Sequence, residues 1–193
     1  MVFSLQVTDF ASLAIDLDRC EFSTMSTLDR IKQEARAYPG RIVLPEAADA
    51  RVIEAAICLG KEGLAHPVLV GNADEIVDTA RESGSKVDNL EIVDPRTSDN
   101  RDRYAASLFE KRKHRGVSED DAAELVRQPL MYANLMVDQG AALGCVAGAV
   151  HTSSDVVRTA LQVVGMQEGC SLVSSFFLME HNLPHQAIQG SAV

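Results

Sequence analysis

The sequence predicts an α/β fold: a mostly parallel sheet with helices on both faces. Two observations support this prediction. Short apolar runs typical of buried strands alternate with longer segments of helical periodicity along the chain. Turn residues such as Pro, Gly and Asp-Pro end most of the apolar runs. Strands that alternate with helices at this spacing are joined by right-handed crossovers, which gives a sheet covered on both sides.

Five runs are expected to form strands, at residues 41–44, 67–70, 90–93, 144–149 and 171–178. Helices are expected over 26–37, 49–62, 73–82, 100–112, 119–127, the segment from Pro129 to about 139, and 156–164. Three residues have the side chains and positions of N-caps: Ser26, Asp49 and Ser118. Gly63 follows the second helix where a left-handed residue is common. Capping and turn residues therefore support the alternation that defines the fold class.

The composition is that of an acidic α/β protein. Of 193 residues, 18 are Lys or Arg and 28 are Asp or Glu, which gives a formal net charge of −10. This charge repels nucleic acid, so any phosphate chemistry requires a local basic site. No run approaches the ~18 consecutive apolar residues of a membrane span, and no secretory signal pattern is present. We therefore expect no membrane partner and a cytoplasmic location, with the four cysteines (20, 58, 145 and 170) as free thiols.

The chain is expected to contain two domains, of which the second is incomplete. Residues 1–24 are interpreted as a poorly ordered extension, with Met25 as the natural initiator; a short edge strand or packed arm is the alternative. Residues 25–145 would form the first α/β domain and residues 146–193 the start of a second. The pattern stops at Val193 without a capped helix or polar tail, so we expect the coding sequence to continue.

Ligands of open parallel sheets bind in the loops at the carboxyl ends of strands. Three loops have this position, at 45–49, 94–98 and 151–155. The third places the hydroxyls of Thr152, Ser153 and Ser154 at a helix start, where the partial positive charge favours anions. Arg158 follows one turn later and could bind the same anion. The alternative is ordinary capping by Ser154 or Asp155, with a solvated Arg158.

A basic cluster at 111–115, which includes Arg112, follows the helix expected at 100–112. Cations are favoured at a helix C-terminus by the dipole alone, so a solvated helix end is the simpler interpretation of these residues. No P-loop or G-x-G-x-x-G motif is present, and the five histidines lack metal-binding spacing. The G-x-S-x-G elbow of hydrolases is also absent. The sequence therefore favours a small-anion site over nucleotide, metal or hydrolase chemistry.

An ordered series of motifs runs along the chain: R-I-V-L-P-E-A at 41–47, R-K-H-R-G at 112–116, G-A-V-H-T-S-S-D-V-V-R-T-A-L-Q at 148–162 and S-L-V-S-S-F-F-L-M at 171–179. This series resembles the phosphate acetyl/butyryl transferases, and most closely their phosphate acetyltransferase members. The resemblance covers about residues 26–193. It implies a two-domain enzyme of isocitrate/isopropylmalate dehydrogenase-like fold, usually dimeric, with its active site between the domains.

The resemblance also implies a reaction: acetyl-CoA and phosphate would give acetyl phosphate and coenzyme A, with coenzyme A as substrate and no metal or prosthetic group. Arg112 and Arg158 would help bind coenzyme A and phosphate, and Thr152, Ser153 and Ser154 would hold the phosphate end. The family's catalytic residues lie C-terminal to residue 193, so we expect this chain alone to be inactive or nearly so. A phosphate butyryltransferase, or a non-catalytic acyl-CoA-sensing domain of the type fused to malic enzymes, is the alternative.

Overall fold

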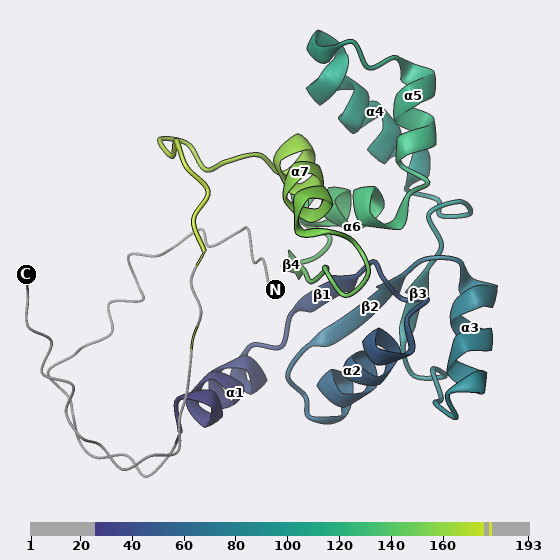
Figure 1. Ribbon diagram of the computed structural model, residues 1–193, viewed down its shortest axis with the longest axis vertical. Helices are drawn as coiled ribbons and strands as arrows, with labels where there is room; N and C mark the ends of the chain where they lie inside the picture. The colour runs from purple at the N-terminus through teal and green to yellow at the C-terminus, as the bar shows by residue number, and fades with distance from the viewer. Residues whose placement is uncertain (1–25, 176–177, 179–193) are drawn as a thin grey trace, which may run out of the picture.

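A computed structural model describes residues 26–175 and residue 178, so the expected extension at 1–24 and Met25 lie outside the described residues. Four strands form one sheet in the order β3-β2-β1-β4, and all three pairings are parallel (Figure 1). The strands are β1 Arg41–Leu44, β2 His66–Val70, β3 Glu91–Val93 and β4 Gly144–Cys145. The parallel sheet predicted from the sequence is therefore confirmed.

The central strands are buried on both faces. Val43 and Val68 face one hydrophobic cluster, whereas Leu44 and Leu69, their neighbours in sequence, face another. Side chains alternate between the two faces along a strand, so continuous apolar runs are required where both faces are covered.

Helices cover both faces of the sheet, as predicted. On one face, α2 Ala50–Lys61 and α3 Ala73–Glu82 contribute buried residues to the cluster around Leu44 and Leu69. On the other face lies α6 Pro129–Asp138, in which every residue from 130 to 137 is buried. Figure 1 shows α6 above the sheet; α7 Ser153–Val163 and α4 Arg101–Arg112 contact α6, and α5 Glu119–Leu125 packs beside α4. α6 is therefore the central helix of its layer.

The expected N-caps are confirmed at three helices. The Ser26 hydroxyl accepts the N–H of Asp29 at the start of α1 Thr27–Ala37. Asp49 caps α2, and Ser118 forms a capping box with Asp121 at the start of α5. Gly63 has the expected left-handed conformation, with φ 66°.

Helix α7 departs from the expected start and cap. It begins at Ser153 rather than Val156, and its N-cap is Thr152 rather than Ser154 or Asp155. A run of four capping-type residues allows several starts by sequence alone. In the structure the first of these four residues is the N-cap, and the Thr152 hydroxyl accepts the N–H of Asp155 at 3.2 Å.

Two expected strands differ in the structure. The strand expected at 144–149 is limited to Gly144–Cys145. The strand expected at 171–178 is absent from residues 171–175, which adopt an irregular conformation with Leu172 83% exposed. An apolar run becomes a strand only when a neighbouring strand pairs with its backbone groups. The described part of the chain provides no such neighbour for 171–175.

Helix α1 is attached to the body by polar contacts. None of its residues is buried, and Arg36 donates to the backbone oxygen of Glu62 at 3.0 Å while Lys32 pairs with the Glu62 carboxylate. Among the described residues, no helix is long and apolar enough to cross a membrane.

Candidate anion site at the carboxyl edge of the sheet

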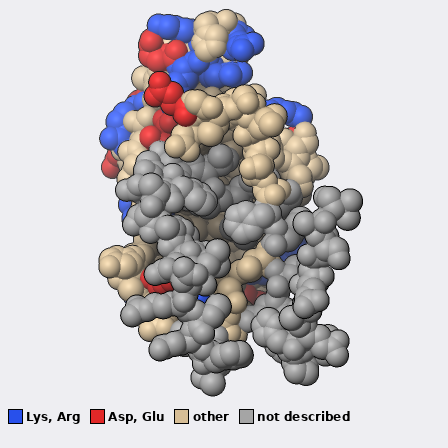
Figure 2. Space-filling view, turned by 90° about the vertical axis from the view of Figure 1, so that its left-hand side faces the viewer, with Lys and Arg blue, Asp and Glu red and all other residues tan. Residues whose placement is uncertain are grey.

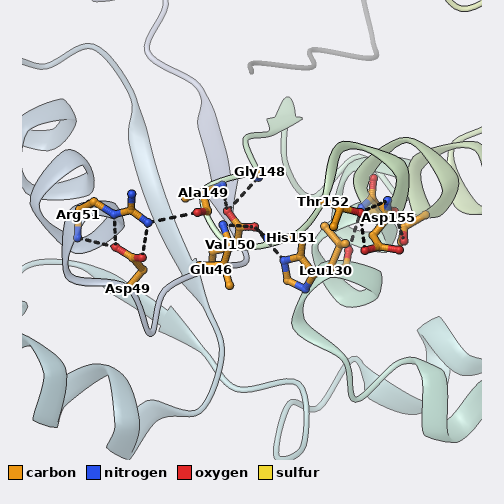
Figure 3. Close-up of polar contacts among 12 residues, drawn as sticks. Glu46, Asp49, Arg51, Leu130, Gly148, Ala149, Val150, His151, Thr152 and Asp155 are labelled. Atoms are coloured by element: carbon orange, nitrogen blue, oxygen red, sulfur yellow. Dashed lines mark hydrogen bonds and ion pairs between the residues drawn. The ribbon is translucent and has the colours of Figure 1, made fainter.

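A buried carboxylate joins the loops that follow β1 and β4. The Glu46 side chain is only 2% exposed. Its two oxygens accept the backbone N–H groups of Gly148, Ala149, Val150 and His151 at 2.6–3.1 Å (Figure 3). β1 and β4 are neighbours in the sheet, so these loops leave the same edge side by side. Glu46 therefore fixes the backbone that leads into α7.

The charge of Glu46 is stabilised by these donors. Burial alone would raise the pKa of the Glu46 carboxyl, but hydrogen bonds from the backbone and ring of His151, and from the N–H groups of Ala149 and Val150, lower it below 4.5. Glu46 is therefore ionised at neutral pH and acts only as an acceptor. It also engages the four N–H groups of this loop, so an incoming anion must use the donors of the α7 start.

We expect this carboxylate to make stability depend on pH. The pKa of Glu46 is lower in the folded chain than its ordinary value of 4.5, so its contribution is complete above that value and is lost as pH falls through the folded pKa. The free energy of unfolding, measured by urea titration at about pH 6 and about pH 3.5, should therefore decrease more in the natural chain than in Glu46→Gln. An equal decrease in both chains would show that other carboxyls cause the acid sensitivity.

A second contact joins the same two loops. Arg51 pairs with Asp49 at 2.7 Å and donates to the backbone oxygen of Ala149 at 3.1 Å. The hydrogen bonds from Arg51 lower the pKa of Asp49 to about 2. The loop after β4 is thus held through its N–H groups by Glu46 and through a carbonyl by Arg51 (Figure 3).

The first turn of α7 brings together several of the predicted site residues. The Thr152 hydroxyl donates to Asp155 at 2.7 Å, and the Ser154 hydroxyl accepts from Arg158 at 3.2 Å. Arg158 also pairs with Asp155 at 3.5 Å, and its side chain remains 62% exposed. Ser153 occupies the first helical position. Arg158 thus folds back to the helix start while remaining largely exposed, and the anion site expected here stays a prediction.

Arg112 is the last residue of α4. Its neighbour Lys111, also at the end of α4, donates to the backbone oxygen of Val163 at 3.0 Å and pairs with Asp138. Val163 ends α7 and lies ~15 Å along the helix axis from Ser153. Figure 2 shows Lys and Arg side chains gathered at the end of the molecule formed by α4 and α5. A shared anion-binding role for Arg112 and Arg158 stays a prediction.

The strand-end loop at 94–98, which follows β3, makes separate contacts. Arg96 pairs with Asp94 at 2.7 Å, and the hydroxyls of Ser98 and Tyr132 are 2.5 Å apart. β2 and β1 separate β3 from β4 in the sheet. This loop is therefore attached to α6 rather than to the Glu46 network.

Cys145 is not an activated nucleophile. Cys58, Cys145 and Cys170 are free, and Cys20 lies outside the described residues. Burial, together with the negative charge of Glu46, raises the pKa of Cys145 to about 12, so this thiol stays protonated at neutral pH. In the described ranges, no three His, Cys, Asp or Glu side chains are arranged to hold a metal ion.

Glu46 and His151 are the site residues that sequence reasoning did not select. The loop at 45–49 was one of three candidates, but its carboxylate binds groups 102–105 positions away. The only available signal was an acidic residue two positions after a buried strand.

The fold and these contacts define an α/β protein whose strand-end loops are joined at the carboxyl edge of a parallel sheet. Residues 26–191 match the family described as phosphate acetyl/butaryl transferase. The chain therefore belongs to the phosphate acetyl/butyryl transferase family.

Curated relatives and solved structures agree with this assignment. The chain is 40% identical to a phosphate acetyltransferase of Thermoanaerobacterium thermosaccharolyticum over 81% of its own length and 47% of that protein's. Identity to the Treponema pallidum phosphate acetyltransferase is 38%, over 83% of this chain and 48% of that protein. The EutD phosphotransacetylase from Staphylococcus aureus superposes with a TM-score of 0.70 at 31% identity, over 75% of this chain and 44% of that one. The chain thus spans about half the length of these relatives.

Proposed function

We propose that the protein containing this chain transfers an acetyl group between coenzyme A and inorganic phosphate. The main support is the family match, which is continuous over residues 26–191, and the relatives that carry the name phosphate acetyltransferase. In one direction a phosphate oxygen bonds to the thioester carbon, the carbon–sulfur bond breaks, and the proton of monohydrogen phosphate passes to sulfur. The products are acetyl phosphate and coenzyme A.

The main difficulty of this reaction is to bring two anions together. Fixed cations and a helix N-terminus overcome it by charge and by orientation. In our proposal, Arg158 with Thr152, Ser153 and Ser154 binds the phosphate end of the substrate, and Arg112 contributes a second cation toward coenzyme A. The first turn of α7 supports this role because Arg158 already lies over Ser154.

The reaction as proposed needs no metal and no prosthetic group, since coenzyme A is a substrate. The catalytic residues would lie in the half of the relatives that this chain does not span. We also propose a cytoplasmic homodimer for the whole protein.

The test compares residues 1–193 with a chain extended through the half found in the relatives. The extended chain should form acetyl phosphate from acetyl-CoA and phosphate, measured by coenzyme A thiol release, and residues 1–193 should not. Faster turnover of butyryl-CoA would replace the acetyl assignment by the butyryl one. Binding of acyl-CoA without turnover by the extended chain would favour the sensing domain. Full turnover by residues 1–193 would contradict the proposed location of the catalytic residues.

A further inference from the structure

The ring of His151 is attached to the buried carboxylate of Glu46. Its Nδ1 lies 2.8 Å from Glu46 Oε1 (Figure 3). An ionised carboxylate only accepts hydrogen bonds, so Nδ1 must carry the proton of this contact. A neutral imidazole has a single N–H group, and the other ring nitrogen then has a lone pair. The contact therefore selects the tautomer in which Nε2 is an acceptor.

Glu46 enforces this tautomer because the carboxylate has no freedom to turn away. Four consecutive backbone N–H groups bind its two oxygens, and the side chain is almost completely buried. The His151 side chain is 37% exposed, and Nε2 makes no hydrogen bond with any other residue that the structure describes. The fixed side of the ring is thus Nδ1, and Nε2 remains available to a ligand.

His151 directly precedes Thr152, the N-cap of α7. The other groups at this helix start are backbone N–H groups, the Arg158 guanidinium, and the hydroxyls of Thr152 and Ser154, whose oxygens already accept from the Asp155 N–H and from Arg158. Asp155 is an acceptor on the same turn, but its oxygens already bind Thr152 and Arg158. Nε2 of His151 therefore places one acceptor beside a group of donors.

An acceptor at this position distinguishes two anions of similar size and charge. Monohydrogen phosphate carries an O–H group that can donate to Nε2, whereas sulfate at neutral pH has acceptors only. A lone pair facing a sulfate oxygen leaves two acceptors opposed and unpaired, and such a mismatch is a strong source of selectivity.

We propose that Glu46 holds His151 in the tautomer whose Nε2 lone pair accepts the O–H of monohydrogen phosphate, and that this contact selects phosphate over sulfate. The inference rests on the proposed function of the α7 start as a phosphate site. Glu46 is a positioning residue that acts through His151, and His151 is the residue that contacts the anion.

The first experiment tests the tautomer on the chain itself and does not depend on acetyl transfer. Ring ¹⁵N shifts of His151 are measured at about pH 8, where free imidazole is neutral. We expect a protonated-type shift for Nδ1 and an unprotonated-type shift for Nε2. In Glu46→Gln, the amide NH₂ can donate to Nδ1, so the ring should shift toward the opposite tautomer. The tautomer mixture of free histidine in the natural chain would overturn the inference.

The second experiment measures selectivity in the extended enzyme. His151→Asn retains a side-chain N–H that can donate to Glu46 but has no counterpart of Nε2. We expect the KM for phosphate to rise about tenfold, with a smaller change in kcat and an almost unchanged inhibition constant for sulfate. His66→Asn is the matched control, since the His66 side chain is exposed at the start of β2.

The outcomes separate this inference from the proposed function. An equal loss of phosphate and sulfate affinity in His151→Asn would show a merely structural role and overturn the inference. If the extended chain transfers no acyl group, the proposed function fails, while the ring shifts and their response to added inorganic phosphate still decide the role of His151. Thermal unfolding of each variant confirms that it is folded before either comparison.

Discussion

Replacing Glu46 by Leu should lower the free energy of unfolding by ~3–5 kcal/mol, because it removes the buried, charged acceptor that four backbone N–H groups share. Leu has a similar volume, so the change removes hydrogen bonds rather than packing. Four N–H groups of residues 148–151 and the His151 ring lose a charged partner that is almost completely buried. Urea unfolding followed by circular dichroism measures the loss.

The matched control is Glu54→Leu on the exposed face of α2, which should change stability by no more than ~0.5 kcal/mol. Glu46→Gln keeps one acceptor oxygen and should lie between Glu46→Leu and the natural chain. If Glu46→Leu is as stable as Glu54→Leu, the four N–H groups find other partners and Glu46 does not hold the two loops together.

Replacing Arg158 by Ala in the extended enzyme should reduce kcat/KM for phosphate or coenzyme A at least about tenfold, or ~1.4 kcal/mol. The guanidinium lies against the Ser154 hydroxyl on the first turn of α7, where helix charge already favours an anion. Arg158→Lys retains the charge without the planar pair of donors, so it should recover only part of the loss.

Arg127→Ala serves as the control for this experiment. Arg127 is half exposed, follows α5 and pairs with Glu124, so its removal should leave the kinetics unchanged. Steady-state rates of acetyl phosphate formation at varied phosphate and acetyl-CoA concentrations measure both variants. Unchanged kinetics in Arg158→Ala would identify Arg158 as a solvated surface residue.

The sequence predicted the parts of the fold that depend on local chemistry. α3 has both of its expected ends, Ala73 and Glu82, and Ser26, Asp49 and Ser118 cap helices as expected. Each of these features depends on residues within one helical turn, where the side chain and its backbone partner are close in sequence. The alternation of strands and helices then determined the layers.

The features that the sequence did not predict depend on distant partners. The strand expected to extend to Ala149 stops at Cys145, and the N–H groups of Gly148 and Ala149 bind the distant Glu46 carboxylate instead of a strand. The run beginning at Ser171 has strand composition but no paired neighbour among the described residues. Periodicity indicates that a segment can be extended, and it does not indicate what pairs with it.

The same distinction between local and distant residues applies to the candidate site. Thr152, Ser153, Ser154 and Arg158 are close in sequence, so one helix start brings them together. Arg112 was joined to them by family resemblance alone. The structure places its neighbour Lys111 against Val163, at the opposite end of α7. Its binding role stays a prediction, and Arg112→Ala in the extended enzyme tests it by the same assay.

The Glu46 contacts also set an order of assembly during synthesis. The carboxylate leaves the ribosome 102–105 residues before the N–H groups that it binds. The first three strands, which pair β1 with β2 and β2 with β3, are complete before β4 and its loop emerge. Contacts between such distant segments form only after the intervening chain has become compact. A nascent chain that stops before residue 148 can therefore contain the three-strand sheet, yet its Glu46 carboxylate must remain hydrated.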